Sequence, residues 1–186
     1  YGERTLTLES LQEFGKKIRT LNEESYIEFL DALNIKALLV NILSTTDELK
    51  RFVRGEIKLP DCYKLLIPLP TLHQSVRSFQ GIQEIASIIG RTVTSLEEFL
   101  DAIRKIMNRL KERGAVGIKD QSAYVRSLDF APVARAEAEN LFNKCLANPN
   151  DSLGWPEAKP LDDFLFHEYM RFARDMEMPV QIHTGY

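Results

Sequence analysis

Residues 179–185, Pro-Val-Gln-Ile-His-Thr-Gly, decide the fold class of this protein. The stretch has the pattern of a short strand, because apolar Val180 and Ile182 alternate with polar Gln181 and His183. Successive side chains of a strand point to opposite faces of a sheet, so the apolar pair suits a layer of helices and the polar pair the other face. The sequence therefore predicts a strand that carries a histidine at its carboxyl end.

Short apolar runs of the same kind occur earlier in the sequence, separated by helical patterns. They cover residues 35–41, 63–69 and 115–119. Short strands that alternate with amphipathic helices indicate parallel strands joined by crossovers, and the chain has no Asn-Gly hairpin signal. The predicted class is α/β, and on pattern alone both a barrel and an open doubly wound sheet remain open.

The intervening helices are predicted from apolar residues at three- and four-residue spacings. They cover residues 8–18, 25–34, 48–54, 95–113, 132–147 and 160–176. The clearest begins at Ser95, which forms a capping box with Glu98, and ends at Gly114. Pro132 and Pro160 suit the first turns of the last two helices. Residues 1–186 are predicted to form a single domain, in which a helical segment of residues 1–34 leads into the first strand.

Composition excludes several classes of partner. The chain has 186 residues, a formal net charge of -3 and 44% hydrophobic residues, which is ordinary for a soluble domain. The charge is too small to favour nucleic acid or a membrane surface, and no apolar run approaches the ~20 residues that span a bilayer. The first residues do not resemble a signal peptide, and Cys62 and Cys145 form no CxxC motif. These features favour a cytoplasmic protein with reduced cysteines.

Candidate functional residues lie where the predicted strands end, because sites in parallel α/β folds form at the carboxyl ends of strands. His183 is a candidate metal ligand or acid–base group, although a histidine can also simply bond a backbone carbonyl. Lys119 can hold a substrate carboxylate as a point charge. When carbamylated, a lysine at this position can bridge two metals. The alternative is an exposed lysine at a strand end without such a role. Tyr124 and Arg126 follow in the same loop. Arg126 could bind a carboxylate with two hydrogen bonds, and a surface role is equally compatible.

Other chemistry-bearing residues are weaker candidates. His73 lies in a proline-rich loop after a predicted strand, and His167 is expected to face solvent on its helix. Trp155 lies in the loop of residues 148–159, where a role in pinning the loop is favoured over a role as a lid. The sequence contains no GxGxxG, GxxxxGK[ST], HExxH or GxSxG motif.

Two segments resemble the amidohydrolase-related branch of the amidohydrolase superfamily, which includes domains fused to glutamine-synthetase-like proteins. They are residues 117–126 (Gly-Ile-Lys-Asp-Gln-Ser-Ala-Tyr-Val-Arg) and residues 179–186 (Pro-Val-Gln-Ile-His-Thr-Gly-Tyr). Residues 26–41 are similar to an early helix–strand region of that family. The resemblance covers most of the chain and is strongest over residues 114–186.

The resemblance implies a TIM-type (β/α) barrel that binds a divalent metal, usually zinc, with manganese as an alternative. His183 would match the histidine ligand of the fifth strand and Lys119 the lysine of the fourth. Tyr124 and Arg126 would bind a small-molecule substrate. The implied activity is a metal-dependent hydrolase in which metal-activated water attacks a small amide, ester or carboxylated substrate. A homo-oligomer is compatible with this interpretation.

The sequence departs from the family pattern, which keeps other functions open. The HxH pair of the family's first strand, its later histidine and its last aspartate are absent, and the only histidines are His73, His167 and His183. A complete barrel needs about 250 residues, so we expect strands 2–5 of a longer protein. The alternatives are a non-oxidative decarboxylase or sugar-acid isomerase on the same scaffold, or a non-catalytic barrel remnant that binds a partner or metabolite.

Overall fold

The computed structural model describes residues 7–185, apart from the side chain of Glu23. Residues 1–6 of the predicted helical segment and Tyr186 of the histidine motif lie outside the described residues. The chain divides into two compact units, residues 1–38 and 39–186. The prediction of a single domain stays a prediction.

The first unit contains two helices, α1 (Leu8–Arg19) and α2 (Glu23–Ala32). Thr7 caps α1 through a capping box with Ser10, and the Asn22 side chain accepts a hydrogen bond from Ser25 N at the start of α2. Both helices were predicted from their apolar spacing. Their first residues follow from these caps, because a side-chain oxygen satisfies a backbone N–H that has no partner within the helix.

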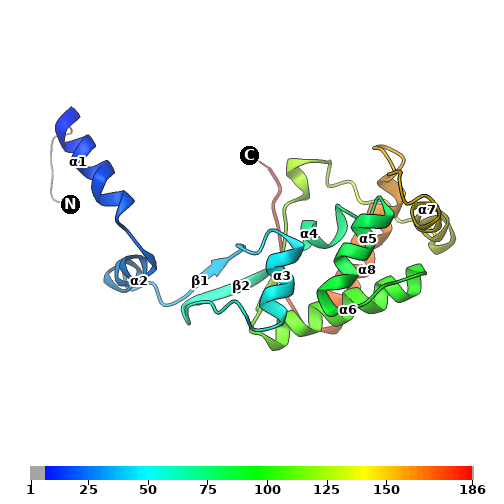
Figure 1. The fold of residues 1–186 in the computed structure, drawn as a ribbon, viewed down its shortest axis with the longest axis horizontal. Coiled ribbons are helices and arrows are strands. Elements are labelled where there is room, and N and C mark those ends of the chain that lie inside the picture. Colours follow the sequence, from blue (N-terminus) through cyan, green and yellow to red (C-terminus); the bar gives the residue numbers. More distant parts are fainter. Residues whose placement is uncertain (1–6, 186) are drawn as a thin grey trace. The chain divides into compact units, whose positions relative to one another are not determined.

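The sheet contains β1 (Leu38–Val40), β2 (Tyr63–Pro68), β3 (Gly117–Asp120) and β4 (Val180–Ile182), in the order β1-β2-β3-β4. Figure 1 labels the first two strands, β1 and β2. β2 and β3 pair in parallel, with Ile67 opposite Ile118, and β3 pairs in parallel with β4. This confirms the predicted parallel α/β class. Successive parallel strands in sequence order form a curled half-barrel, consistent with part of a TIM-type barrel.

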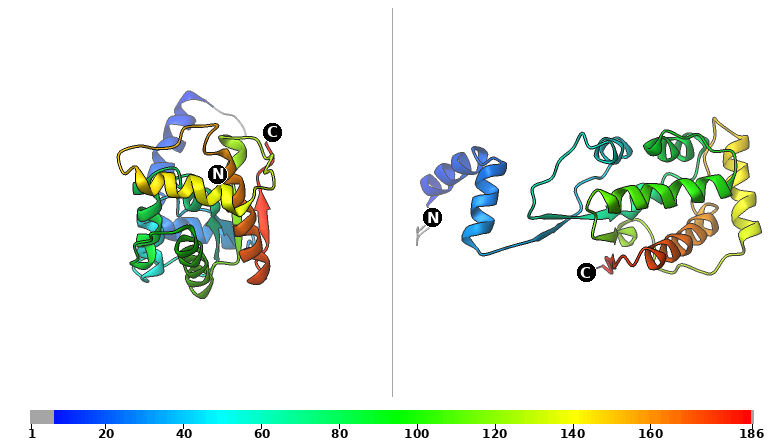
Figure 2. Two further views of the ribbon diagram at one scale, coloured as in Figure 1. Left: turned by 90° about the vertical axis from the view of Figure 1, so that its right-hand side faces the viewer. Right: turned by 90° about the horizontal axis from the view of Figure 1, so that it is seen from below.

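Helices connect the strands of the second unit. They are α3 (Thr46–Val53), α4 (Leu69–His73), α5 (Phe79–Ala86), η1 (Ser87–Ile89), α6 (Leu96–Glu112), η2 (Ser122–Tyr124), α7 (Arg135–Ala147) and α8 (Lys159–Asp175). Figure 2 shows α7 lying across the ends of α6 and α8, which it contacts. No helix among residues 7–185 combines the length and the apolar character needed to cross a membrane.

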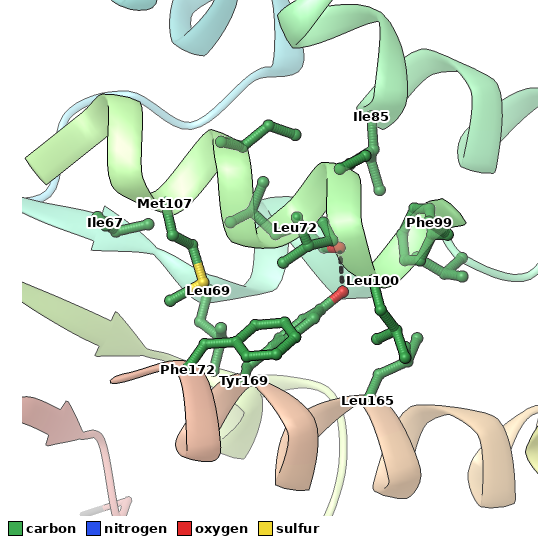
Figure 3. Close-up of a cluster of buried hydrophobic side chains, with 14 of the residues drawn as sticks. Ile67, Leu69, Leu72, Ile85, Phe99, Leu100, Met107, Leu165, Tyr169 and Phe172 are labelled. Atoms are coloured by element: carbon green, nitrogen blue, oxygen red, sulfur yellow. Dashed lines mark hydrogen bonds between the residues drawn. The ribbon is translucent and has the colours of Figure 1, made fainter. Parts of the chain in front are cut away.

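The core lies between the sheet and the helices, and α6 and α8 face each other across it (Figure 3). Ile67 and Ile118, which are opposite each other in the sheet, are fully buried here. Burial of Ile118 was predicted, but Val116 and Ile182, which were also predicted to face the helices, are 41% and 43% exposed because Val116 directly precedes β3 and Ile182 ends β4. The Tyr169 hydroxyl donates to the carbonyl of Leu72 at 2.9 Å, so the one polar atom of this large buried ring is satisfied. Burying each aliphatic side chain of this kind contributes about 1.5–3 kcal/mol.

Several details differ from the prediction, and one is that α4 and α5 lie in a stretch where no helix was located from the sequence. His73 is the last residue of α4, a short helix that begins directly after β2, so it does not lie in a loop. α7 begins at Arg135, and Pro132 therefore lies before the helix and not in its first turn. At α6, Glu98 N donates to Ser95 Oγ, but the Glu98 carboxylate accepts from Thr94, so only half of the predicted capping box forms.

Candidate functional site at the carboxyl ends of β3 and β4

The inner face of the sheet, opposite the helix-covered core, carries Lys119 on β3. Lys119 pairs with Gln181 of β4 in the parallel register, so these two side chains share a face, and His183, two residues later, continues it. Lys119 and His183 are both partly exposed. The fold therefore places a cationic side chain and an imidazole on one face of neighbouring strands, at the edge where parallel sheets bind ligands.

His183 follows β4 and is held from two sides. Its backbone N–H donates to the carbonyl of Asp120 at 2.9 Å, which extends the pairing of β3 and β4. Its ring stacks on that of Tyr124, with centroids 4.5 Å apart and planes 14° from parallel. Tyr124 lies in η2 and is 59% exposed. The structure thus brings together two of the predicted site residues.

Arg126, the third residue predicted to meet substrate, is buried among internal partners. Its Nη1 donates to Asp162 at 2.7 Å and its Nη2 to Asp163 at 2.5 Å, both on α8. Nε donates to the carbonyl of Ser127, and the guanidinium lies 4.1 Å from the centre of the Phe130 ring. Substrate binding by Arg126 stays a prediction, and it would require the guanidinium to leave its carboxylate partners.

Sequence reasoning missed a buried polar network at this edge of the sheet. His73 Nδ1 lies 2.6 Å from Asp162 Oδ1, and His73 Nε2 lies 3.4 Å from Ser122 Oγ. The Ser122 hydroxyl in turn donates to Asp120 Oδ1 at 2.6 Å. All four residues are at most 3% exposed. Single acidic or hydroxyl residues give no sequence signal of burial, and of these four residues only His73 was a candidate from the sequence.

The electrostatics of the network are dominated by Asp162. Burial by itself raises the pKa of this carboxyl, but the hydrogen bond and charge of His73, followed by those of Arg126, outweigh it and lower the pKa below its usual range. The neighbouring Tyr169 hydroxyl has its pKa raised well above the ordinary value, first by burial and then by the negative charge of Asp162. Asp162 is therefore ionised and Tyr169 neutral at physiological pH.

The described residues do not by themselves fit a metal ion. Among residues 7–185, no three histidine, cysteine or acidic side chains come close enough to share one. Asp120 Oδ2 is buried and lacks a hydrogen-bond partner among these residues, but Asp120 is opposite Ile182 in the sheet, on the face away from His183. The prediction that His183 binds zinc or manganese therefore stays a prediction, and it requires further ligands.

Other candidates have structural partners. His167 is partly buried, and its Nε2 lies 3.0 Å from the carbonyl of Phe130, so it does not simply face solvent. Trp155 is 44% exposed and lies under the guanidinium groups of Arg77 and Arg126, at 5.3 and 5.2 Å. These contacts agree with a role in pinning the loop. Cys62 and Cys145 are both unpaired, as predicted.

Comparison with known proteins adds information about the fold. No protein-family model and no curated protein matches the sequence. Among solved structures, uronate isomerase from Thermotoga maritima matches with a TM-score of 0.55 and 14% identity over 79% of this chain, and glucuronate isomerase from Caulobacter crescentus with 0.58 and 18% over 83%. A "putative metal-dependent hydrolase" from Lactobacillus casei ATCC 334 matches with 0.56 and 20% over 89%.

The matched region is 32% of each isomerase chain and 41% of the L. casei chain, so this protein spans about a third of its neighbours' length. At such low identity the likeness concerns the fold alone. Together with the parallel order β1-β2-β3-β4, it shows that the chain has the architecture of part of a parallel (β/α) barrel.

Proposed function

We propose that this chain is the part of a metal-dependent (β/α)-barrel enzyme that binds a small carboxylated substrate, with Lys119 holding the carboxylate. The observation that carries the proposal is that Lys119 and His183 share the inner face of β3 and β4 at the edge where parallel sheets bind ligands. An ammonium group on a strand is a positive point charge that can pair with a carboxylate. The stacked Tyr124 supplies an adjacent aromatic wall.

His183 is proposed as one ligand of the metal, with its ring orientation fixed by Tyr124. Because residues 7–185 hold no cluster of three suitable ligands, the proposal requires additional ligands from other segments or another chain. Hydrolysis of a small amide, ester or carboxylated compound is our first assignment. Lys119 would position the substrate through its carboxylate, and its carbamylation remains an alternative use of the same side chain.

Isomerisation of a sugar acid is the alternative reaction. It is favoured by two of the structural neighbours, which are isomerases of uronate and glucuronate. If the substrate carries a carboxylate, Lys119 would hold that group in either reaction, so its role is the same in each. Non-oxidative decarboxylation and a non-catalytic metabolite-binding role are also compatible with this site.

The binding affinity for glucuronate, measured by calorimetry or NMR, tests whether Lys119 holds a substrate carboxylate. We expect Lys119→Met to weaken binding by about 10- to 100-fold, the value of a charged hydrogen bond, and Lys119→Arg to weaken it less. Lys105→Met is the matched control, because Lys105 is exposed on α6 and pairs with Asp101. Equal binding by the Lys119→Met and Lys105→Met variants would remove Lys119 from the site.

Metal content tests the second part of the proposal. The natural full-length protein, purified without chelators, should carry zinc or manganese in near-stoichiometric amount, and His183→Ala should reduce it sharply. His167→Ala is the control, because His167 contacts the Phe130 carbonyl. Retention of metal by the His183→Ala protein would exclude His183 as a ligand.

A further inference from the structure

The loop of residues 121–126, which carries Tyr124, is anchored at both ends while its tip is exposed. At its start, Ser122 is fully buried, and its backbone N–H and hydroxyl both donate to Asp120 Oδ1, at 3.1 and 2.6 Å. At its end, the Arg126 side chain is 1% exposed. Between them, Tyr124 and Val125 are 59% and 64% exposed. The position of Tyr124 therefore depends on what holds the two ends.

Both ends are connected to the same carboxylate on α8. Asp162 Oδ2 accepts from Arg126 Nη1 at 2.7 Å, and Asp162 Oδ1 lies 2.6 Å from His73 Nδ1. The other nitrogen of His73 lies 3.4 Å from Ser122 Oγ. The side chains of Ser122, His73, Asp162 and Arg126 thus form a continuous chain of polar contacts, which joins α4 and α8 to the loop. We call these four residues the loop clasp.

We propose that His73 and Asp162 are positioning residues, which hold the loop after β3 so that Tyr124 stacks on His183. The clasp lies near the carboxyl ends of β2 and β3, because His73 ends the helix that follows β2 and Ser122 follows β3. Tyr124 is separated from Ser122 by one residue. The inference rests on the proposed function for the importance of the His183 ring, but the geometry of the loop can be measured independently of any metal or substrate.

Energetics favour a positioning role over a purely stabilising one. Burying an ion pair costs desolvation energy that the charge attraction only roughly offsets, so apolar residues of similar volume would stabilise the core as well. A network of directed polar contacts instead restricts a segment to one arrangement, because each donor and acceptor has a fixed direction. Every side chain of the loop clasp has such a partner. The contacts of the loop clasp therefore specify the orientation of the loop.

The test is the proton NMR signal of the His183 ring in the 186-residue chain at fixed pH. The sequence has three histidines, so single variants assign their ring signals. Stacking on Tyr124 should shift the His183 signals upfield, and Tyr124→Leu should remove that shift. Ser122→Ala and His73→Asn should remove a large part of it, because the asparagine amide reaches only the Nδ1 position. His73→Gln, whose amide reaches the Nε2 position, should retain the contact with Ser122 and more of the shift.

Thermal unfolding of each variant is measured beside the spectra. His167→Gln is the control, because it removes an imidazole that lies on α8 and is not part of the loop clasp. An unchanged His183 signal in folded Ser122→Ala and His73→Asn would overturn the proposal. If His73→Asn does not fold, the His183 signal of Ser122→Ala provides the test, since this variant leaves His73 and Asp162 in place. Unfolding of Ser122→Ala as well would also overturn it, because the clasp would then be a requirement of the core. Neither result depends on metal or substrate. Failure of this proposal can therefore be distinguished from failure of the proposed function.

Discussion

Asp162 and Arg126 form a 2.7 Å ion pair in the interior, with side chains that are 2% and 1% exposed. The two residues belong to α8 and to the loop after β3, and 36 positions of sequence separate them. A second carboxylate, Asp163, takes the other terminal nitrogen of the same guanidinium. The pairing therefore joins the loop beside the candidate site to a long helix that covers the core.

Removing the guanidinium should be strongly destabilising. Arg126→Ala leaves two buried carboxylates without this partner, and breaking a buried pair typically costs about 3–5 kcal/mol. We expect a loss of that size in the free energy of unfolding, measured by urea denaturation. Arg91→Ala is the matched control, because the Arg91–Asp101 pair is about half exposed and such pairs contribute about 0–1 kcal/mol. Similar losses in both variants would contradict the interior role of Arg126.

Stability should fall in acid because of Asp162. Burial raises the pKa of this carboxyl, but the interactions with His73 and Arg126 lower it further, so the net pKa is below the ordinary 3.8. A carboxyl with a lowered pKa in the folded state stabilises the fold above its unfolded pKa, and the contribution is lost as pH falls through the folded pKa.

The expected result is a decline in the unfolding free energy of the wild-type protein below about pH 4. Asp162→Asn should be less stable at neutral pH and should show a shallower decline. Denaturant titrations between neutral and acidic pH measure both. Parallel pH profiles for the two proteins would show that another group is responsible.

Gly81 should not tolerate a side chain. A Cβ on this residue of α5 would collide with the backbone carbonyl oxygen of Ser75, which cannot move as a flexible side chain would. Gly81→Ala is expected to destabilise the second unit by about 1–3 kcal/mol, as other overpacked sites do. Gly154→Ala is the control, since a Cβ there would meet nothing within 4 Å, and it should stay within about 0.5 kcal/mol of wild type. Thermal unfolding of both variants provides the comparison.

The two thiols should react at different rates. Burial raises the pKa of Cys145 to about 11, and the nearby Glu157 carboxylate adds to the shift. Because the thiolate is the reactive form, Cys145 should be alkylated slowly in the folded protein, whereas Cys62, which is partly exposed, should react first. Mass spectrometry of iodoacetamide-treated native and urea-unfolded protein measures this order. Rapid labelling of Cys145 in the native state would show that α7 opens readily.

Local patterns allowed most of the second unit to be predicted. The apolar stripe of α6 and its glycine C-cap indicated the helix to within about two residues at each end, because helical spacing depends only on near neighbours. The alternation predicted the burial of Ile118 correctly, but Val116 and Ile182, which were assigned to core faces by the same rule, are exposed. The shared face of Lys119 and His183 follows from the same period of two, once β3 and β4 are paired.

The sequence by itself determined the order of the strands and of the longer helices, the apolar face of α6, and the location of Lys119 and His183 near strand ends. Only the tertiary structure decided that Arg126 is buried, that His73 lies in a helix, and that Asp162 connects the two. The physical reason is the separation in sequence of the residues that interact. Periodicity and caps are set by residues within one or two turns, whereas the partner of a buried charge is set by which distant segments the core packs together.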